Sequence, residues 1–117
     1  MNIIFGTDNA EKLSEKYIVL ELDTFRFKDS DADTTAYCVV ETVPLDEMVA
    51  IPDLTSRHVS LVESFKSKQW QDCLSHAESL RGSWSGEVDT YYENITERVR
   101  QYAETPPSDD WTHVIVK

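Results

Sequence analysis

The period of the apolar residues changes once along this chain, close to Pro44, and no other feature constrains the fold as strongly. Before this point, the runs 18–27 and 34–43 are rich in β-branched and aromatic residues, which is typical of strands. After it, apolar residues recur at intervals of three and four, which is the spacing of an amphipathic helix. Strands followed by helices indicate an α+β fold.

The N-terminal half is expected to begin with a short strand over 2–5 and a helix of about two turns. Gly6 ends the strand. Asp8 is followed three residues later by Glu11, which is the spacing of a capping box at a helix start. The order of elements expected before Pro44 is therefore β-α-β-β.

The alternation of apolar residues changes phase within the strand predicted over 18–27. Its first three apolar residues share one face, and its two phenylalanines fall on the other: Ile18, Leu20, Leu22, then Phe25, Phe27. A bulge or sharp bend near Asp23 and Thr24 would return all five side chains to a single buried face. The strand should pair with 34–43 in an antiparallel hairpin.

Three helices are expected after Pro52, each with one apolar stripe. Gly82 lies just past the end of the second helix, and Pro106 stops the third. The stripes are Leu54, His58, Leu61, Val62, Phe65, then Trp70, Cys73, Leu74, Ala77, Leu80, and then Val88, Tyr91, Tyr92, Ile95, Val99, Tyr102. The residues predicted to be largely buried are Phe65, Trp70, Leu74, Ala77, Val88, Tyr91 and Ile95.

The last stretch, 111–116, is either a final strand or an extended tail laid on the helices. If it is a strand, the order β-α-β-β-α-β allows a ferredoxin-like sheet with an enlarged second helical region.

A chain of 117 residues is one domain's length. We expect a single domain, residues 1–117, with a sheet-forming part over 1–43 and a connector over 44–52 with room for a helical turn near Leu45–Val49. A helical part over 53–104 and a C-terminal extension over 105–117 follow.

The charge balance excludes one class of partner. The chain has 22 acidic and 11 basic residues, a formal net charge of −11, so a nucleic acid would be repelled. The start of the chain lacks the basic region of a signal peptide, and no apolar run approaches the ~20 residues of a membrane span. With Cys38 and Cys73 in separate apolar segments, these features predict a soluble, cytoplasmic protein with reduced thiols.

The candidate metal sites are incomplete. Asp29, Asp31 and Asp33 alternate as in a calcium loop, but Thr34 stands where glycine is needed and Val40 where glutamate is needed. A solvated hairpin loop is therefore expected. His58 and His76 fall on consecutive helices without a further ligand at helical spacing, so no zinc site is expected.

No catalytic set is evident either. Cys73 lies on an apolar stripe, where burial makes a thiol inert, although His76 follows three residues later. We therefore expect no cofactor, no metal and no catalytic residues, and the sequence favours a protein that is not an enzyme.

Two tryptophans are the candidate partner-binding residues. Trp84 lies between glycines 82 and 86, and Trp111 follows Ser108-Asp109-Asp110, so both occupy irregular segments beside the helices. Large aromatic residues on loops either fill the edge of the core or anchor a partner. We expect at least one of the two rings to keep an exposed edge and to belong to a contact with another copy or another protein.

Three functions remain open from the sequence. The first is a small acidic interaction or regulatory module that binds a protein partner or itself. The second is a small-ligand binder or enzyme with a pocket between sheet and helices, which requires converging polar residues. The third is an acidic nucleic-acid mimic, which requires the 22 carboxylates to form phosphate-like rows on one face.

The second half also resembles a known kind of helical segment. Phe65-x4-Trp70-x2-Cys73, then Ala77, Leu80, Tyr92, Arg98 and Tyr102, and finally Pro106-Pro107-Ser108-Asp109-Asp110-Trp111 with Lys117, are similar to the tetratricopeptide-like tail that follows the catalytic domain of bacterial class III adenylate cyclases. The resemblance implies that the small residue at Cys73 lets two helices approach and that the Pro-Pro-to-Trp run caps the array. No catalytic role transfers, because the cyclase domain is not part of the match.

The chain as a whole resembles small proteins of marine bacteria and phages. The likeness lies in the Phe5-Gly6 start and in the strand Val19-Leu20-Glu21-Leu22-Asp23-Thr24-Phe25. It implies nothing about activity.

Overall fold

The computed structural model describes residues 2–27, 32–41 and 48–116. The fold is mixed α+β, as the sequence predicts. Its contacts divide into two compact units, which we call the sheet unit (Met1–Thr42 with His113–Lys117) and the helical unit (Val43–Thr112). The C-terminal residues thus belong with the first strands, although the chain between them forms the helices.

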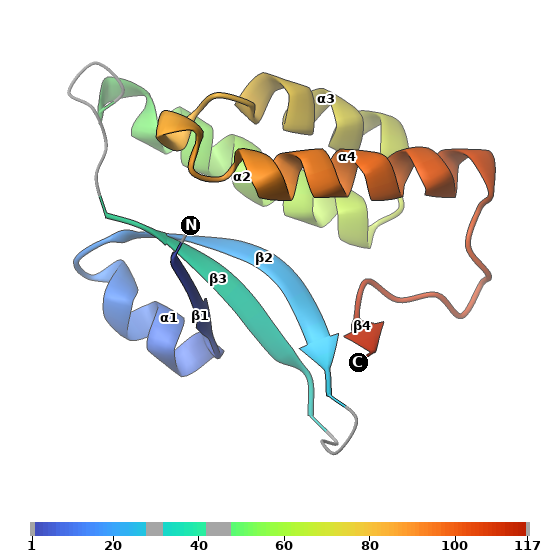
Figure 1. Cartoon of the computed structure of the whole chain (residues 1–117), viewed down its shortest axis with the longest axis horizontal. Coiled ribbons are helices and arrows are strands. Elements are labelled where there is room, and N and C mark those ends of the chain that lie inside the picture. Colours follow the sequence, from blue (N-terminus) through green and yellow to red (C-terminus); the bar gives the residue numbers. More distant parts are fainter. Residues whose placement is uncertain (1, 28–31, 42–47, 117) are drawn as a thin grey trace. The chain divides into compact units, whose positions relative to one another are not determined.

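The sheet unit contains a four-stranded sheet and one helix (Figure 1). Strand β3 is antiparallel to both β1 and β2, and β4 is parallel to β2. Helix α1 packs against β1, β2 and β3. The strand order is β1-β3-β2-β4, and the elements are β1 (Asn2–Phe5), α1 (Thr7–Ser14), β2 (Ile18–Arg26), β3 (Thr34–Val40) and β4 (Ile115–Val116).

The first three strands form a split βαβ unit. Because β1 and β2 are both antiparallel to β3, they run parallel to each other, joined through α1 with β3 between them. The second half does not repeat this arrangement. Strand β4 is parallel to β2 and therefore antiparallel to β3, so β3, the helices and β4 do not form a second βαβ unit. The ferredoxin-like topology is wrong, although the terminal strand is present.

The predicted bulge in β2 is confirmed. The register with β3 shifts between Glu21 and Thr24, and the hydroxyls of Thr24 and Thr35 then lie 3.0 Å apart. The shift places Phe25 on the face that carries Leu20 and Leu22. Phe25 and Phe27 stack with ring centroids 6.0 Å apart, but Phe27 is exposed and Ile18 and Phe25 are half-buried. The bulge therefore does not return all five side chains to a buried face.

The capping box predicted for α1 does not form. The helix starts at Thr7, so Asp8 is already within its first turn. The N-cap residue is Gly6, which has no side chain to accept a hydrogen bond from the first turn. The backbone N–H of Gly6 instead donates to the Thr35 carbonyl at 3.0 Å. Gly6 has a φ of 96°, which lets the strand turn directly into the helix. Gly6 is the one residue between β1 and α1, so Asp8 cannot occupy the N-cap position.

The helical unit packs α2 against α3 and α3 against α4. Its elements are the 3-10 turn η1 (Met48–Ala50), α2 (Ile51–Lys66), α3 (Trp70–Leu80), the 3-10 turn η2 (Trp84–Gly86) and α4 (Asp89–Glu104). Of the residues predicted to be buried, Trp70 and Leu74 are only half-buried, and the others are buried. Gly82 has a φ of 84° just after α3, as expected for a helix end.

Some expectations lie outside the described residues, including most of the helical turn near 45–49 and the loop carboxylates at 29 and 31. Within the described part of the chain, no helix has the length and apolarity needed to cross a membrane.

Candidate functional site

The core of the helical unit contains a buried group of three polar aromatic side chains. The Trp84 ring nitrogen donates to the Tyr92 hydroxyl at 3.1 Å, and the same hydroxyl lies 3.0 Å from Nδ1 of His58. His58 comes from α2, Tyr92 from α4 and Trp84 from η2, and all three are buried. A buried polar atom is costly without a partner, so these contacts fix how α2, α4 and η2 meet.

Of the two candidate tryptophans, Trp111 keeps an exposed edge and Trp84 does not, in keeping with the expectation that at least one ring would. Trp84 is completely buried, so its ring offers no edge to a partner. Its backbone has a φ of 57°, which costs an L-residue about 1–2 kcal/mol. Burying a Trp side chain of about 200 Å² at ~25 cal/mol per Å² contributes roughly 5 kcal/mol, so burial outweighs the strain. The periodicity of the sequence did not reveal this, because Trp84 lies between the helices and outside their stripes.

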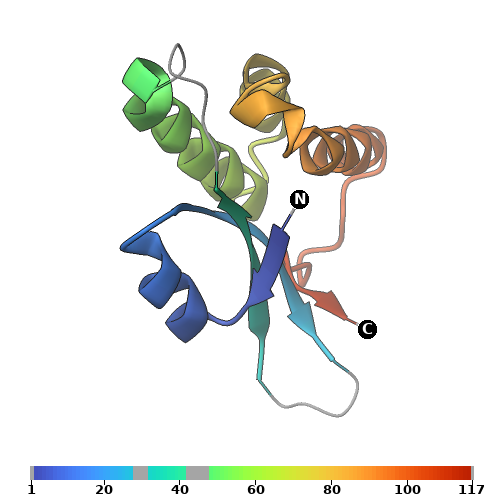
Figure 2. The same cartoon turned by 60° about the vertical axis from the view of Figure 1, so that its left-hand side comes forward.

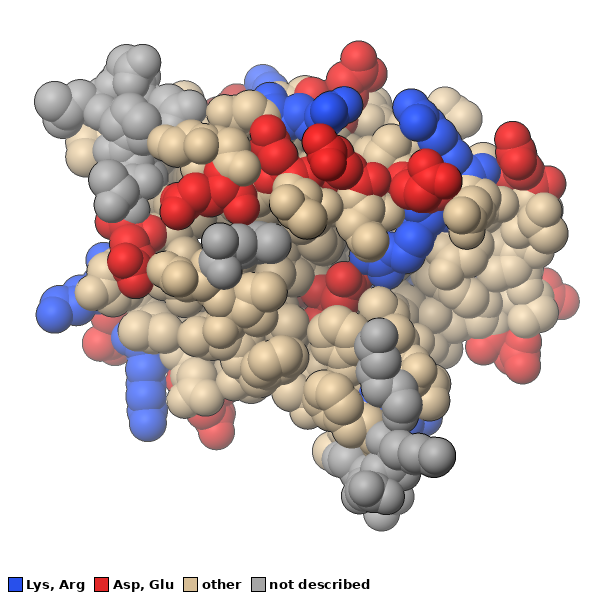
Figure 3. Space-filling view, in the orientation of Figure 1, with Lys and Arg blue, Asp and Glu red and all other residues tan. Residues whose placement is uncertain are grey.

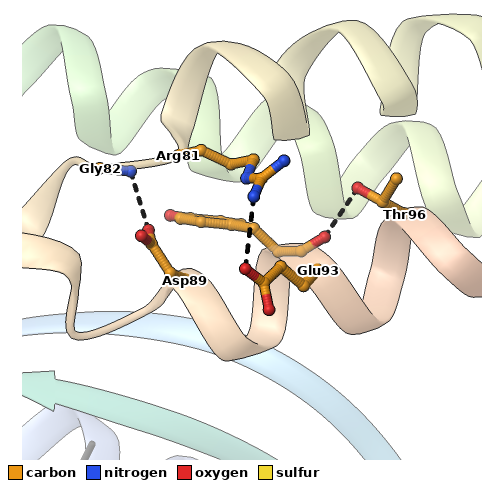
Figure 4. A network of polar contacts seen from close by, with 6 residues as sticks. Arg81, Gly82, Asp89, Glu93 and Thr96 are labelled. Carbon is orange, nitrogen blue, oxygen red and sulfur yellow. Dashed lines mark hydrogen bonds and ion pairs between the residues drawn. The ribbon is translucent and has the colours of Figure 1, made fainter.

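Polar contacts close the turn that carries Trp84 (Figure 4). The Gly82 N–H donates to Asp89 at 2.8 Å, and the Arg81 guanidinium lies 3.3 Å from Glu93. The Thr96 hydroxyl donates to the Tyr92 carbonyl at 2.7 Å. The first two contacts join the end of α3 to the first turns of α4, and the third lies within α4.

Four aromatic rings meet at the other end of the helical unit, and we call them the ring cluster: Phe65, Trp70, Tyr102 and Trp111. Trp70 and Tyr102 stack with centroids 5.2 Å apart, and the Trp111 ring lies edge-on to both, at 5.7 and 5.4 Å. Phe65 is buried beneath them, whereas the other three are half-buried. All four are residues on which the resemblance to the tetratricopeptide-like tail rests.

Two turns of the chain assemble the ring cluster. Between α2 and α3, Lys68 has a φ of 60°, and Gln69 N–H donates to the Ser64 carbonyl at 2.8 Å, so Phe65 and Trp70 lie side by side. After α4 ends at Glu104, the chain turns back, and Trp111 N–H donates to the Ser108 carbonyl at 3.0 Å.

Charged groups flank the ring cluster. The Lys68 ammonium lies 5.8 Å from the centre of the Trp111 ring, and the Arg98 guanidinium lies 5.3 Å from the centre of Phe65, both within the range of cation–π attraction. The Ser108 hydroxyl donates to Asp110 and, with a smaller contribution from Lys68, lowers the pKa of that carboxyl. The cluster therefore has an apolar centre flanked by two basic groups, Lys68 and Arg98, and one acidic group, Asp110.

Two hollows open on the surface of the helical unit. One, of about 380 Å³, lies beside the ring cluster and is lined by Lys68, Gln69, Trp70, Gln71, Asp72 and Ala103. The other, of about 430 Å³, lies between α3 and α4 and is lined by Gln71, Leu74, Ser75, Glu78, Arg81, Thr96 and Arg100.

The remaining candidate residues are placed as follows. Cys73 and Cys38 are both buried, and burial raises the pKa of the Cys73 thiol to about 11, opposed in part by the Arg98 charge. Such a thiol is a poor nucleophile at neutral pH. His58 belongs to the buried group described above. Asp33 pairs with Arg26 at 2.8 Å. Within the described ranges, no three acidic, histidine or cysteine side chains are grouped as metal ligands.

Comparison with known proteins finds no family model, no curated protein and no solved structure that matches this chain. The function must therefore be argued from the surfaces of the molecule.

Proposed function

We propose that this protein is a small binding module and that it contacts a protein partner through the ring cluster. The observation that carries the proposal is the meeting of three half-buried rings, Trp70, Tyr102 and Trp111, at one end of the helical unit. Tryptophan and tyrosine bury much surface at a low cost in side-chain entropy and are enriched among the residues that dominate binding energy.

The surroundings of the ring cluster favour a protein partner over a small ligand. The adjoining hollow is shallow and lined largely by polar side chains, whereas small-molecule sites are enclosed and mostly apolar. An apolar centre with charges at its rim is the usual anatomy of a protein interface. Trp111 is thus retained as a candidate anchor, and Trp84 is not.

The charge of the chain bears on the partner and the compartment. A net charge of −11 attracts partners with a basic surface and repels nucleic acid. On the face shown in Figure 3, basic side chains are interspersed among the acidic ones over the helices, which does not favour a phosphate-like row. Two buried thiols suit a reducing compartment, and we propose the cytoplasm.

The test compares two alanine variants. Trp111→Ala removes a half-buried ring that contacts the other three rings of the cluster, and Val59→Ala removes an exposed apolar side chain on α2 as a matched control. Proteins retained by the immobilised chain from extracts of the encoding cell should be identified, purified and titrated by calorimetry. Trp111→Ala should weaken binding by about 2 kcal/mol, roughly 30-fold, and Val59→Ala should not.

An unfolding curve for each variant checks that the fold is intact. Equal affinities for the wild-type chain and a folded Trp111→Ala variant would remove the ring cluster from the interface.

A further inference from the structure

The two edges of the sheet differ in how they are protected. The outer edge of β2 carries Glu21 and Asp23, contains the bulge, and is covered by β4 at Phe25 and Arg26. Charges, bulges and covering segments are the devices by which proteins prevent a strand edge from pairing with another chain. Strand β1, at the other edge, reads Asn-Ile-Ile-Phe and has no charge, proline or bulge (Figure 2).

The register of β1 shows which of its backbone groups point outward. Gly6 N–H donates to Thr35, the residue that continues the β1–β3 register opposite it, so this is a hydrogen-bonded pair. Such pairs alternate along an antiparallel ladder, so Ile4 and Asn2 also bond inward to β3. The N–H and C=O groups of Ile3 and Phe5 therefore point away from β3, toward the open edge.

The same two residues expose their side chains. Ile3 is 49% exposed and Phe5 is 48% exposed, and the Phe5 ring lies 6.5 Å from both Phe25 and Phe27. The outward Phe5 carbonyl already accepts from the Asn9 amide at 2.9 Å, but a carbonyl oxygen can accept a second hydrogen bond. The edge thus combines backbone groups that point away from β3 with an apolar surface.

We propose that β1 pairs with β1 of a second copy, antiparallel, about a twofold axis at Ile4. The strand is its own complement in this register. The two outward residues are two positions apart, so Ile3 of each copy faces Phe5 of the other, and the N–H groups of each donate to the carbonyls of its opposite. Both Ile3–Phe5 pairs bury apolar surface on one face of a continuous eight-stranded sheet.

The contact is small, because only two residues of each strand present outward groups, and it forms a weak dimer. Two chains of net charge −11 repel each other, and salt screens this repulsion. The dimer therefore becomes tighter as salt is added, whereas a dimer held by ion pairs would become weaker. None of the ring cluster takes part, so this inference stands independently of the proposed function.

Cysteine crosslinking tests the register. Ile4 of each copy would form the non-hydrogen-bonded pair on the axis, with Cα atoms about 4.5 Å apart, which a disulfide can bridge. Ile3 of each copy would be about 8 Å from its equivalent, from the rise per residue and the strand spacing, which a disulfide cannot bridge. Under mild oxidation, Ile4→Cys should form a covalent dimer at least about tenfold faster than the control Ile3→Cys.

Sedimentation equilibrium tests the contact without crosslinking. The wild-type chain should show a monomer–dimer equilibrium that shifts toward dimer with salt. Ile3→Lys should abolish the dimer, and Val59→Lys, which makes the same change of charge at an exposed site on α2, should leave it unchanged. A monomer at every concentration, equal crosslinking at positions 3 and 4, or a dimer that survives Ile3→Lys would each overturn the proposal.

Discussion

The core of the helical unit and the β1 edge of the sheet unit differ in how far they bury their apolar side chains. In the helical unit, Trp84, Tyr92, Ile95 and Val99 are completely buried, and the polar atoms among them have partners. In the sheet unit, Ile3, Phe5 and Phe27 remain about half-exposed, and β1, as far as the structure describes it, has no charge, proline or bulge at its open edge. The difference separates a fully buried core, which stabilises the helices, from a strand edge that offers apolar side chains for contact.

The largest expected effect on the free energy of unfolding comes from a substitution in the helical core. Ile95→Ala removes a completely buried side chain from α4 and should lower the free energy of unfolding by ~2–5 kcal/mol. Ile3→Ala, at a half-exposed position on β1, should cost less than about 1 kcal/mol. Urea unfolding curves measure both. Equal losses would show that the two units are packed alike.

The buried polar group should give the next largest effect. Tyr92→Phe removes the hydroxyl that accepts from Trp84 and leaves the indole N–H buried without that partner. The expected loss of stability is ~1–3 kcal/mol, because an unsatisfied buried donor carries its full desolvation cost. Tyr17→Phe, at an exposed tyrosine before β2, is the control and should be neutral. If Tyr92→Phe is also neutral, the hydrogen bonds of the Tyr92 hydroxyl do not contribute to the stability of the helical core.

The sequence predicted the helical unit better than the sheet unit, for a physical reason. Helix stripes depend on local spacing, so the buried faces around His58, Ala77 and Ile95 follow from residues three and four apart. The bulge near Asp23 was also local, visible as a change of phase. The place of β4 beside β2 depends on pairing across some ninety residues, for which local patterns give no signal.

The candidate site was only partly predictable. Trp111 was identified because it lies on an irregular segment, but the same argument misplaced Trp84, whose position depends on a strained turn and a hydrogen bond to Tyr92. Trp70 and Tyr102 were assigned to the core by their helical spacing. Their rings keep exposed edges because both residues lie near helix ends, where the neighbouring helices cover less of the apolar stripe.

A smaller effect is expected at the turn after α3. Gly82 has a φ of 84°, and a Cβ at this position would meet nothing within 4 Å. Gly82→Ala should therefore cost only the backbone strain, about 1–2 kcal/mol, with no added clash. Thermal unfolding of this variant isolates the strain. A loss well above this range would indicate that the turn rearranges and releases Trp84.

A further effect is absent near neutral pH and appears only at alkaline pH. The pKa of Cys73 is raised from 9.0 to about 11, so the unfolded chain loses this proton before the folded chain does. The free energy of unfolding should then fall as pH rises from about 9 toward 11, and Cys73→Ala should reduce that slope. In the folded protein near neutral pH, Cys73 should not react with a thiol reagent until denaturant is added. Rapid modification without denaturant would contradict its burial.

Hydrogen–deuterium exchange within β1, read residue by residue by NMR, tests the contrast between the two units most directly. In dilute protein, the amides of Ile3 and Phe5 should exchange rapidly, while that of Ile4, bonded inward to β3, and that of Ile95 in the helical core should exchange slowly. Raising the protein concentration should slow Ile3 and Phe5 alone. Slow exchange at Ile3 and Phe5 in dilute protein would contradict an unpaired outer edge of β1, and rapid exchange at Ile95 would contradict a fully buried helical core.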